Sequence, residues 1–185
     1  SGPQTDLGIV FQSPVLLDWR NVLDNVLIQL ELRGLDPRQY RDRALQLLAD
    51  VGLEGFQDRR PRELSGGMRQ RVAIVRALIH EPTLLMMDEP FGALDALTRE
   101  QMRIDLEKLW LAQRHTLIFV THGISEAVAL ADRVVVMTPR PGRIEKIIPI
   151  DLPRPRNKAV VTSARFTEYC DEITECFMRN GVIRY

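Results

Sequence analysis

The 185-residue chain has few cysteines, no excess of charge of either sign and no long apolar run. Cys170 and Cys176 are its two cysteines. On one helix they would lie roughly 9 Å apart, which is too far for a disulfide. Two unpaired thiols indicate a reducing compartment. No segment approaches the roughly 18 consecutive apolar residues that a membrane-spanning helix needs.

The charges balance, with 25 Lys and Arg residues against 25 Asp and Glu residues. Proteins that bind nucleic acid usually carry a basic excess, so we expect no nucleic-acid partner. Apolar residues make up 45% of the chain, which is enough for a core and argues against disorder. The length predicts one domain, or one domain with a small appendage.

Short apolar runs alternate with amphipathic stretches along most of the chain. Strands are expected at residues 7–11, 84–87, 117–120 and 134–137, with helices at 68–79, 97–113 and 124–131 between them. This alternation is typical of an α/β fold, in which a parallel sheet has helices on both faces. Residues 12–64 carry only helical patterns, so we expect helices and no strand in this segment. A last amphipathic helix at about 163–179 packs on the core or recruits a partner, and the sequence leaves this open.

Polar residues follow three of the predicted strands. Gln12 follows the first, Asp88 and Glu89 follow the second, and His122 follows the third. Ligands of open parallel sheets bind beyond the carboxyl ends of the strands, so we expect these side chains to surround one ligand. Two acids after an apolar strand suit Mg-nucleotide chemistry, with one acid on the hydrated metal and the other on an attacking water. The alternative for the two acids is a buried strand that emerges into solvent.

The segment Leu64-Ser65-Gly66-Gly67-Met68 opens the next predicted helix. Ser65 is a good N-cap, and the two glycines leave backbone N–H groups uncovered at the start of the helix. Unsatisfied donors and the helix dipole together favour an anion. Taken alone, a Ser-Gly-Gly turn that caps a helix is the simpler interpretation.

In their joint order these segments resemble the ATP-binding subunit of an ABC transporter. Gln12 is similar to the family's Q-loop glutamine, and residues 64–71 are similar to its signature motif. Residues 84–88 are similar to Walker B, and the remaining matches are Glu89 to the general base, Asp95 to the D-loop and His122 to the switch histidine. The resemblance extends over nearly the whole chain.

The resemblance implies a partial P-loop NTPase (RecA-like) fold and the cofactors ATP and Mg²⁺. It implies that Glu89, His122 and Gln12 are catalytic, and that Asp88 and Gln12 hold Mg²⁺ through water. The residues implied to bind the ATP of a second subunit in trans are Ser65, Gly66, Gly67, Met68 and Asp95.

The same resemblance divides the chain into four segments. Residues 1–12 are the end of a catalytic core that closes at the Q-loop, and residues 13–64 are the helical subdomain. Residues 65–152 hold the signature helix and the RecA-like core with Walker B, D-loop and switch histidine. Residues 153–185 are a C-terminal tail helix.

The resemblance also implies partners and a location. Two ATP-binding subunits pair head to tail, and a groove between the Q-loop and the helical subdomain receives a short helix of a membrane permease. This places the protein in the cytoplasm, peripheral on the inner face of the membrane. Residues 13–25 would lie in that groove, with Leu16, Leu17 and Trp19 as apolar contacts. The alternative is that these three side chains hold the loop against the following helix.

Residues 64–72, 88–99 and 139–144 are similar to importers for nitrate, sulfonate or taurine. Relatives that import bicarbonate, pyrimidine or thiamine precursors look alike, so the solute stays open.

A phosphate-binding loop needs Gly-x-x-x-x-Gly-Lys-Ser/Thr, and no glycine of this chain is followed by lysine. We therefore expect the chain to be the C-terminal two-thirds of such a subunit, with weak ATP binding and negligible turnover on its own. We also expect exposed apolar sheet surface and self-association. Two functions stay open: an energy-coupling ATPase subunit, or a non-catalytic module that docks a permease or an intact partner subunit.

Overall fold

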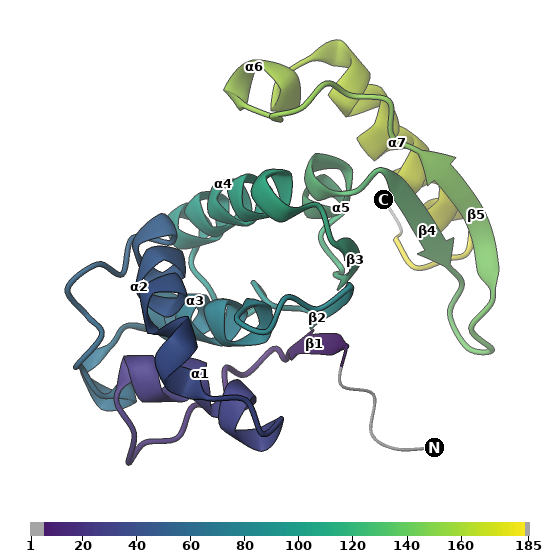
Figure 1. The fold of residues 1–185 in the computed structure, drawn as a ribbon. Helices are drawn as coiled ribbons and strands as arrows, with labels where there is room; N and C mark the ends of the chain where they lie inside the picture. Colours follow the sequence, from purple (N-terminus) through teal and green to yellow (C-terminus); the bar gives the residue numbers. More distant parts are fainter. Residues whose placement is uncertain (1–5, 184–185) are drawn as a thin grey trace. The chain divides into compact units, whose positions relative to one another are not determined.

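The computed structural model of the chain describes residues 6–183. It divides into two compact units, Ser1–Val120 and Thr121–Tyr185, and each unit is described by itself (Figure 1). No helix among residues 6–183 is both long and apolar enough to span a membrane.

The first unit contains a three-stranded parallel sheet. Its strands are β1 (Leu7–Val10), β2 (Leu84–Asp88) and β3 (Thr116–Val120), in the order β1-β2-β3. The register pairs Val10 with Met87 and Asp88 with Val120, so the carboxyl ends of all three strands lie at one edge. The first three predicted strands and their parallel arrangement are confirmed.

Helices and loops make up the rest of the described part of the first unit (Figure 1). They are α1 (Val22–Leu32), α2 (Arg41–Asp50), α3 (Gly66–Leu78) and α4 (Ala96–Gln113), with short 3-10 helices η1 (Pro37–Tyr40) and η2 (Pro61–Glu63). Helix α1 packs against α2 and α3, and α3 lies against β1. That approach is close, because a Cβ at Gly8 would lie 2.7 Å from the Ala77 carbonyl oxygen. Residues 13–64 contain helices and loops only, as their pattern predicts.

The two faces of this sheet differ in burial. Val10, Leu85 and Met87 on one face are buried. On the other face, Ile9, Met86 and Ile118 are register neighbours and are 42%, 38% and 45% exposed. The α/β class is confirmed, whereas the first unit by itself buries one face of its sheet and leaves this apolar row exposed.

The second unit contains α5 (Ile124–Leu130), β4 (Arg133–Met137), β5 (Ile144–Pro149), α6 (Lys158–Val161) and α7 (Ala164–Arg179). Strand β4 pairs antiparallel with β5, so its expected place in the parallel sheet is wrong. Thr138 closes the turn between them, since its N–H donates to the Arg143 carbonyl at 2.9 Å and its Oγ1 accepts from the Arg143 N–H at 3.0 Å. Strand β4 therefore pairs within a local hairpin. The sequence pattern did not predict β5, because the prolines around it are typical of turns.

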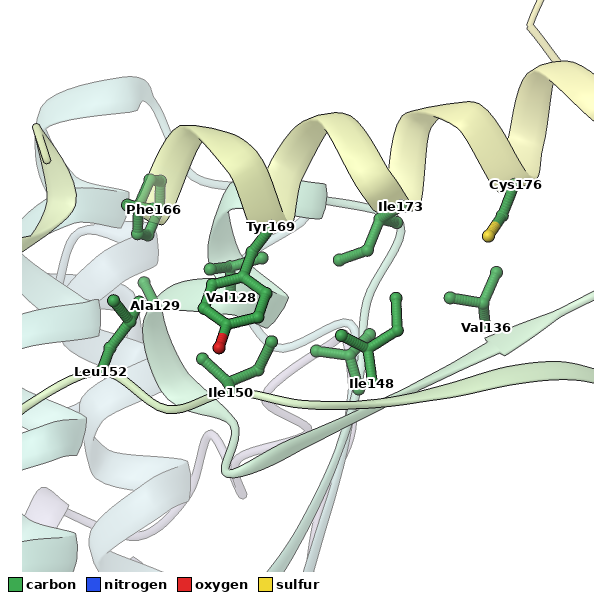
Figure 2. Packing of buried hydrophobic residues seen from close by; sticks show 11 residues of the cluster. Val128, Ala129, Val136, Ile148, Ile150, Leu152, Phe166, Tyr169, Ile173 and Cys176 are labelled. Atoms are coloured by element: carbon green, nitrogen blue, oxygen red, sulfur yellow. The ribbon is translucent and has the colours of Figure 1, made fainter. Parts of the chain in front are cut away.

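Helix α7 supplies one wall of the core of the second unit. Figure 2 shows Phe166, Tyr169, Ile173 and Cys176 on the side of α7 that faces α5 and the hairpin. The helix therefore packs on the core of its own unit, which is one of the two roles that its pattern allows. Beside this core Arg156, 1% exposed, donates to the Val128 and Ala131 carbonyls at 2.8 and 2.7 Å. These bonds satisfy carbonyls at the end of α5, which have no partner within the helix.

Candidate functional site

The carboxyl ends of β1 and β2 bring Gln12, Asp88 and Glu89 to one edge of the sheet. Asp88 is the last residue of β2 and pairs with Val120 of β3. Glu89 follows it with a φ of +42°, an uncommon conformation for a residue other than glycine. Its N–H donates to the Val120 carbonyl at 2.9 Å, which ties the turn to β3. Strain of this kind is concentrated at functional sites in proteins.

Gly92 lies where two of these side chains meet. A Cβ built on Gly92 would be 3.2 Å from Gln12 Nε2 and 3.5 Å from Glu89 Oε2. The Gln12 amide and the Glu89 carboxylate therefore converge on the same backbone, although they are 77 positions apart in the sequence. No local pattern in the sequence distinguishes Gly92 from an ordinary turn glycine, so its place at the site appears only in the fold.

His122 belongs to the second unit, where it precedes Gly123, the N-cap of α5. Its neighbour Thr121 orders the turn, since Thr121 Oγ1 accepts from the Gly123 N–H at 2.9 Å and donates to Glu126 at 2.7 Å. The convergence of His122 with Gln12, Asp88 and Glu89 on one ligand stays a prediction.

Ser65 is the N-cap of α3, as predicted. Its Oγ accepts a hydrogen bond from the Met68 N–H at 3.2 Å. Gly66 is exposed, and a Cβ added to it would meet nothing within 4 Å. N–H groups in the first turn of a helix have no acceptor within the helix, so this end of α3 can accept an anion.

Asp95 is the N-cap of α4. Its carboxylate accepts from the Thr98 N–H at 3.0 Å and from Thr98 Oγ1 at 2.6 Å. These hydrogen bonds from Thr98 hold the pKa of Asp95 below its usual value. The described structure thus gives Asp95 a capping role, which is independent of any nucleotide.

A cavity of about 370 Å³ lies between the segment after β1, the start of α3 and the turn after β2. Gln12, Leu16, Gly66 and Arg69 are among its lining residues. Leu17 is held instead by the buried side chain of Asn25, which accepts from the Leu17 N–H at 2.7 Å and donates to its carbonyl at 3.0 Å. Of the three apolar contacts expected here, Leu16 lines the cavity, whereas Leu17 and Trp19 do not.

The donors at the sheet edge suit a metal that is shared with phosphate. Among residues 6–183 no group of three or more His, Cys, Asp and Glu side chains is arranged to hold a metal by itself. Mg²⁺ is usually bound by one or two carboxylates and completed by water and substrate phosphates. The Asp88 carboxylate and the Gln12 amide fit such a set, because Asp88 is exposed at the strand end.

Comparison with known proteins identifies the family. The family profile described as "ABC transporter" matches residues 2–92. An uncharacterized ABC transporter ATP-binding protein of Methanocaldococcus jannaschii is 51% identical over 172 residues, which are 93% of this chain and 63% of that protein. The taurine import ATP-binding protein of Rhizobium johnstonii is 46% identical, over 92% of this chain and 67% of its own length.

A solved structure supports the same assignment. It is an ATP-binding cassette in a dimeric, post-hydrolysis state bound to ADP and Pi, with 34% identity and a TM-score of 0.65. The match covers 78% of this chain and 63% of the solved one. The chain therefore spans just under two-thirds of the length of the first curated relative and of this structure. The chain belongs to the ABC transporter family, and its relatives include ATP-binding proteins named for import.

Proposed function

We propose that Gln12, Asp88 and Glu89 form the part of an importer's ATPase site that faces the terminal phosphate of ATP. The observation that carries this proposal is the convergence of the Gln12 amide and the Glu89 carboxylate at Gly92, beside the end of the Asp88 strand. This edge is where ligands of open parallel sheets bind.

Each side chain has a chemically suitable task in this proposal. The Asp88 carboxylate and the Gln12 amide oxygen would hold a hydrated Mg²⁺. The Glu89 carboxylate orients the attacking water and takes its proton. His122 donates a ring N–H to a phosphate oxygen. Bound Mg²⁺ would supply neutralisation of the phosphate charge.

The start of α3 acts on a second nucleotide in this proposal. Ser65, Gly66, Gly67 and Met68 form the first turn of a 13-residue helix that Ser65 caps. The uncovered N–H groups and the helix dipole suit the phosphates of an ATP held by a partner subunit. Asp95 supports the neighbouring turn through its hydrogen bonds to Thr98.

The cavity beside Gln12 is the proposed docking site for a short permease helix. Leu16 and Val15 provide apolar surface there, and Asp18 and Arg69 provide one charge of each sign. A subunit that docks in this way lies in the cytoplasm, peripheral on the inner face of the membrane. The proposed solute is a small sulfonate such as taurine, and it rests on the relative named for taurine import.

The 185-residue chain has no Gly-Lys pair and so no phosphate-binding loop of its own. We propose that it binds ATP weakly alone and acts by lending the start of α3 to a subunit that has this loop. The test compares Mg-ATP turnover by the chain alone, by a homologous cassette alone and by their mixture, with Glu89→Gln in the chain as control. A turnover of the mixture that exceeds the sum of the two separate rates supports the proposal. Turnover by the isolated chain that Glu89→Gln abolishes would overturn the claim of weak activity alone.

Binding of the chain to a permease in the absence of ATP would favour the alternative function, a non-catalytic docking module. In that case the chain would bind a permease, the mixture would gain no turnover, and variants of Ser65 would leave the homologue's rate unchanged.

A further inference from the structure

Helix α3 binds the loop around Gln12 through two side chains that none of the roles above uses. Gln70, 2% exposed, donates Nε2 to the Phe11 carbonyl at 3.2 Å. Arg76 donates Nη1 to the Val15 carbonyl at 2.8 Å and Nη2 to the Pro14 carbonyl at 2.9 Å. The three accepting carbonyls lie on both sides of Gln12 in the chain.

One of these carbonyls belongs to a strained residue. Val15 has a φ of +40°, which is a genuine outlier for a β-branched side chain. A conformation of this kind persists only where the surroundings hold it. Val15 is 62% exposed, so packing contributes little to holding this conformation. The two hydrogen bonds from Arg76 to Pro14 and Val15 are the contacts that can hold the strained turn.

The loop and the start of α3 line the same cavity. Gln12, Pro14 and Val15 line the cavity of about 370 Å³ from one side, and Gly66 and Gln70 line it from α3. Arg76 lies six residues beyond Gln70 on the same helix, which is about 1.7 turns. A shift of the loop that breaks its bonds to Arg76 therefore changes the position of Gln12 relative to the start of α3.

We propose that Arg76 is a positioning residue. It clamps Pro14 and Val15 to α3 through two hydrogen bonds and thereby fixes the position of Gln12. This proposal rests in part on the proposed function. An occupant of the cavity that moves the loop then moves Gln12 relative to the start of α3, because Arg76 ties the loop to α3. Gln70 assists from the other side of Gln12, at Phe11. The guanidinium fork of Arg76 is suited to this task because it serves two neighbouring carbonyls at once.

The clamp can be tested in the 185-residue chain without nucleotide or permease. Hydrogen exchange is measured for a peptide spanning residues 12–21, in which the Leu17 N–H donates to Asn25 and the Arg20 N–H donates to the Leu17 carbonyl. Arg76→Met should make these amides exchange roughly 5- to 30-fold faster, while exchange in β2 stays unchanged. Arg59→Met is the matched control, since Arg59 pairs with Glu63 on the surface. Unchanged exchange in the loop of Arg76→Met would overturn the clamp.

A second variant separates strain from simple loss of packing. Asparagine tolerates a positive φ better than valine, so Val15→Asn should relieve the strain that Arg76 holds. We expect Val15→Asn to return the loop exchange of Arg76→Met most of the way to the wild-type rate. Failure of Val15→Asn to slow the exchange would overturn the role of strain.

The test of coupling uses an assembled importer in which this chain pairs with a subunit that has the phosphate-binding loop. Arg76→Met should lower the permease-stimulated ATP turnover by a larger factor than the basal turnover, and Arg76→Lys should retain part of the stimulation. Loss of basal turnover and stimulation by the same factor would overturn the positioning role. Absence of turnover in the wild-type complex would instead overturn the proposed function, and loop exchange would still decide the clamp.

Discussion

Gly67 of α3 and Thr98 of α4 are in contact so closely that the glycine has no room for a side chain. A Cβ at Gly67 would lie 2.5 Å from Thr98 Cγ2. The second glycine of the signature segment is thus required by a neighbouring helix, whether or not a phosphate is bound. Thr98 also donates to the Asp95 carboxylate, so one residue joins the first turns of both helices.

Gly67→Ala should destabilise the chain by about 1–3 kcal/mol, because the new methyl group clashes with Thr98. Gly66→Ala is the matched control, since its Cβ would meet nothing within 4 Å. Thr98→Ser removes the clashing methyl group and should restore most of the stability of Gly67→Ala. Urea denaturation measures all of these variants, and equal stability of Gly67→Ala and Gly66→Ala would contradict the packing argument.

The pH dependence of stability should contain a contribution from Asp95. Hydrogen bonds from Thr98 lower the pKa of this carboxyl in the folded chain. Its contribution is therefore present above the ordinary carboxyl pKa and is lost as the pH falls through the lowered value. Asp95→Asn keeps an N-cap without this titration. The difference between the urea midpoints of wild type and Asp95→Asn should shrink from pH 6 to pH 3, and a constant difference would exclude the effect.

His80 should titrate below the ordinary histidine value. Burial, together with the Arg33 guanidinium 3.1 Å away, lowers the pKa of His80. The folded chain then binds fewer protons than the unfolded chain below about pH 6.5, so acidification through this range costs stability. An NMR titration should show the low pKa, and Arg33→Met should raise it. An unchanged pKa in Arg33→Met would mean that burial alone is responsible.

The exposed apolar row Ile9, Met86 and Ile118 should make the 185-residue chain self-associate. Neighbouring apolar side chains on an open sheet face favour contact between copies. Met86→Lys places a charge in the middle of this row and should reduce the average mass that light scattering measures at high concentration. Leu97→Lys is the control, because Leu97 is 85% exposed on a helix. A monomeric wild type at high concentration would refute this expectation.

The sequence by itself was sufficient for the elements that local chemistry defines. Apolar runs predicted β1, β2 and β3, and the Ser-Gly-Gly segment predicted the start and the cap of α3. The order of the motifs was sufficient for the family, because a motif is read along the chain. These features depend on residues that are close in sequence, so they can be predicted without knowledge of the fold.

Only the tertiary structure decided which distant residues meet. The hairpin that pairs β4 with β5, the convergence of Gln12 and Glu89 at Gly92, and the Arg76 bonds to Pro14 and Val15 have no local signature. Arg76 lies 61 positions from Val15, and at that separation a hydrogen bond depends on how α3 packs. Packing is a collective property of the core, and for that reason the positions of these side chains appear only once the chain is folded.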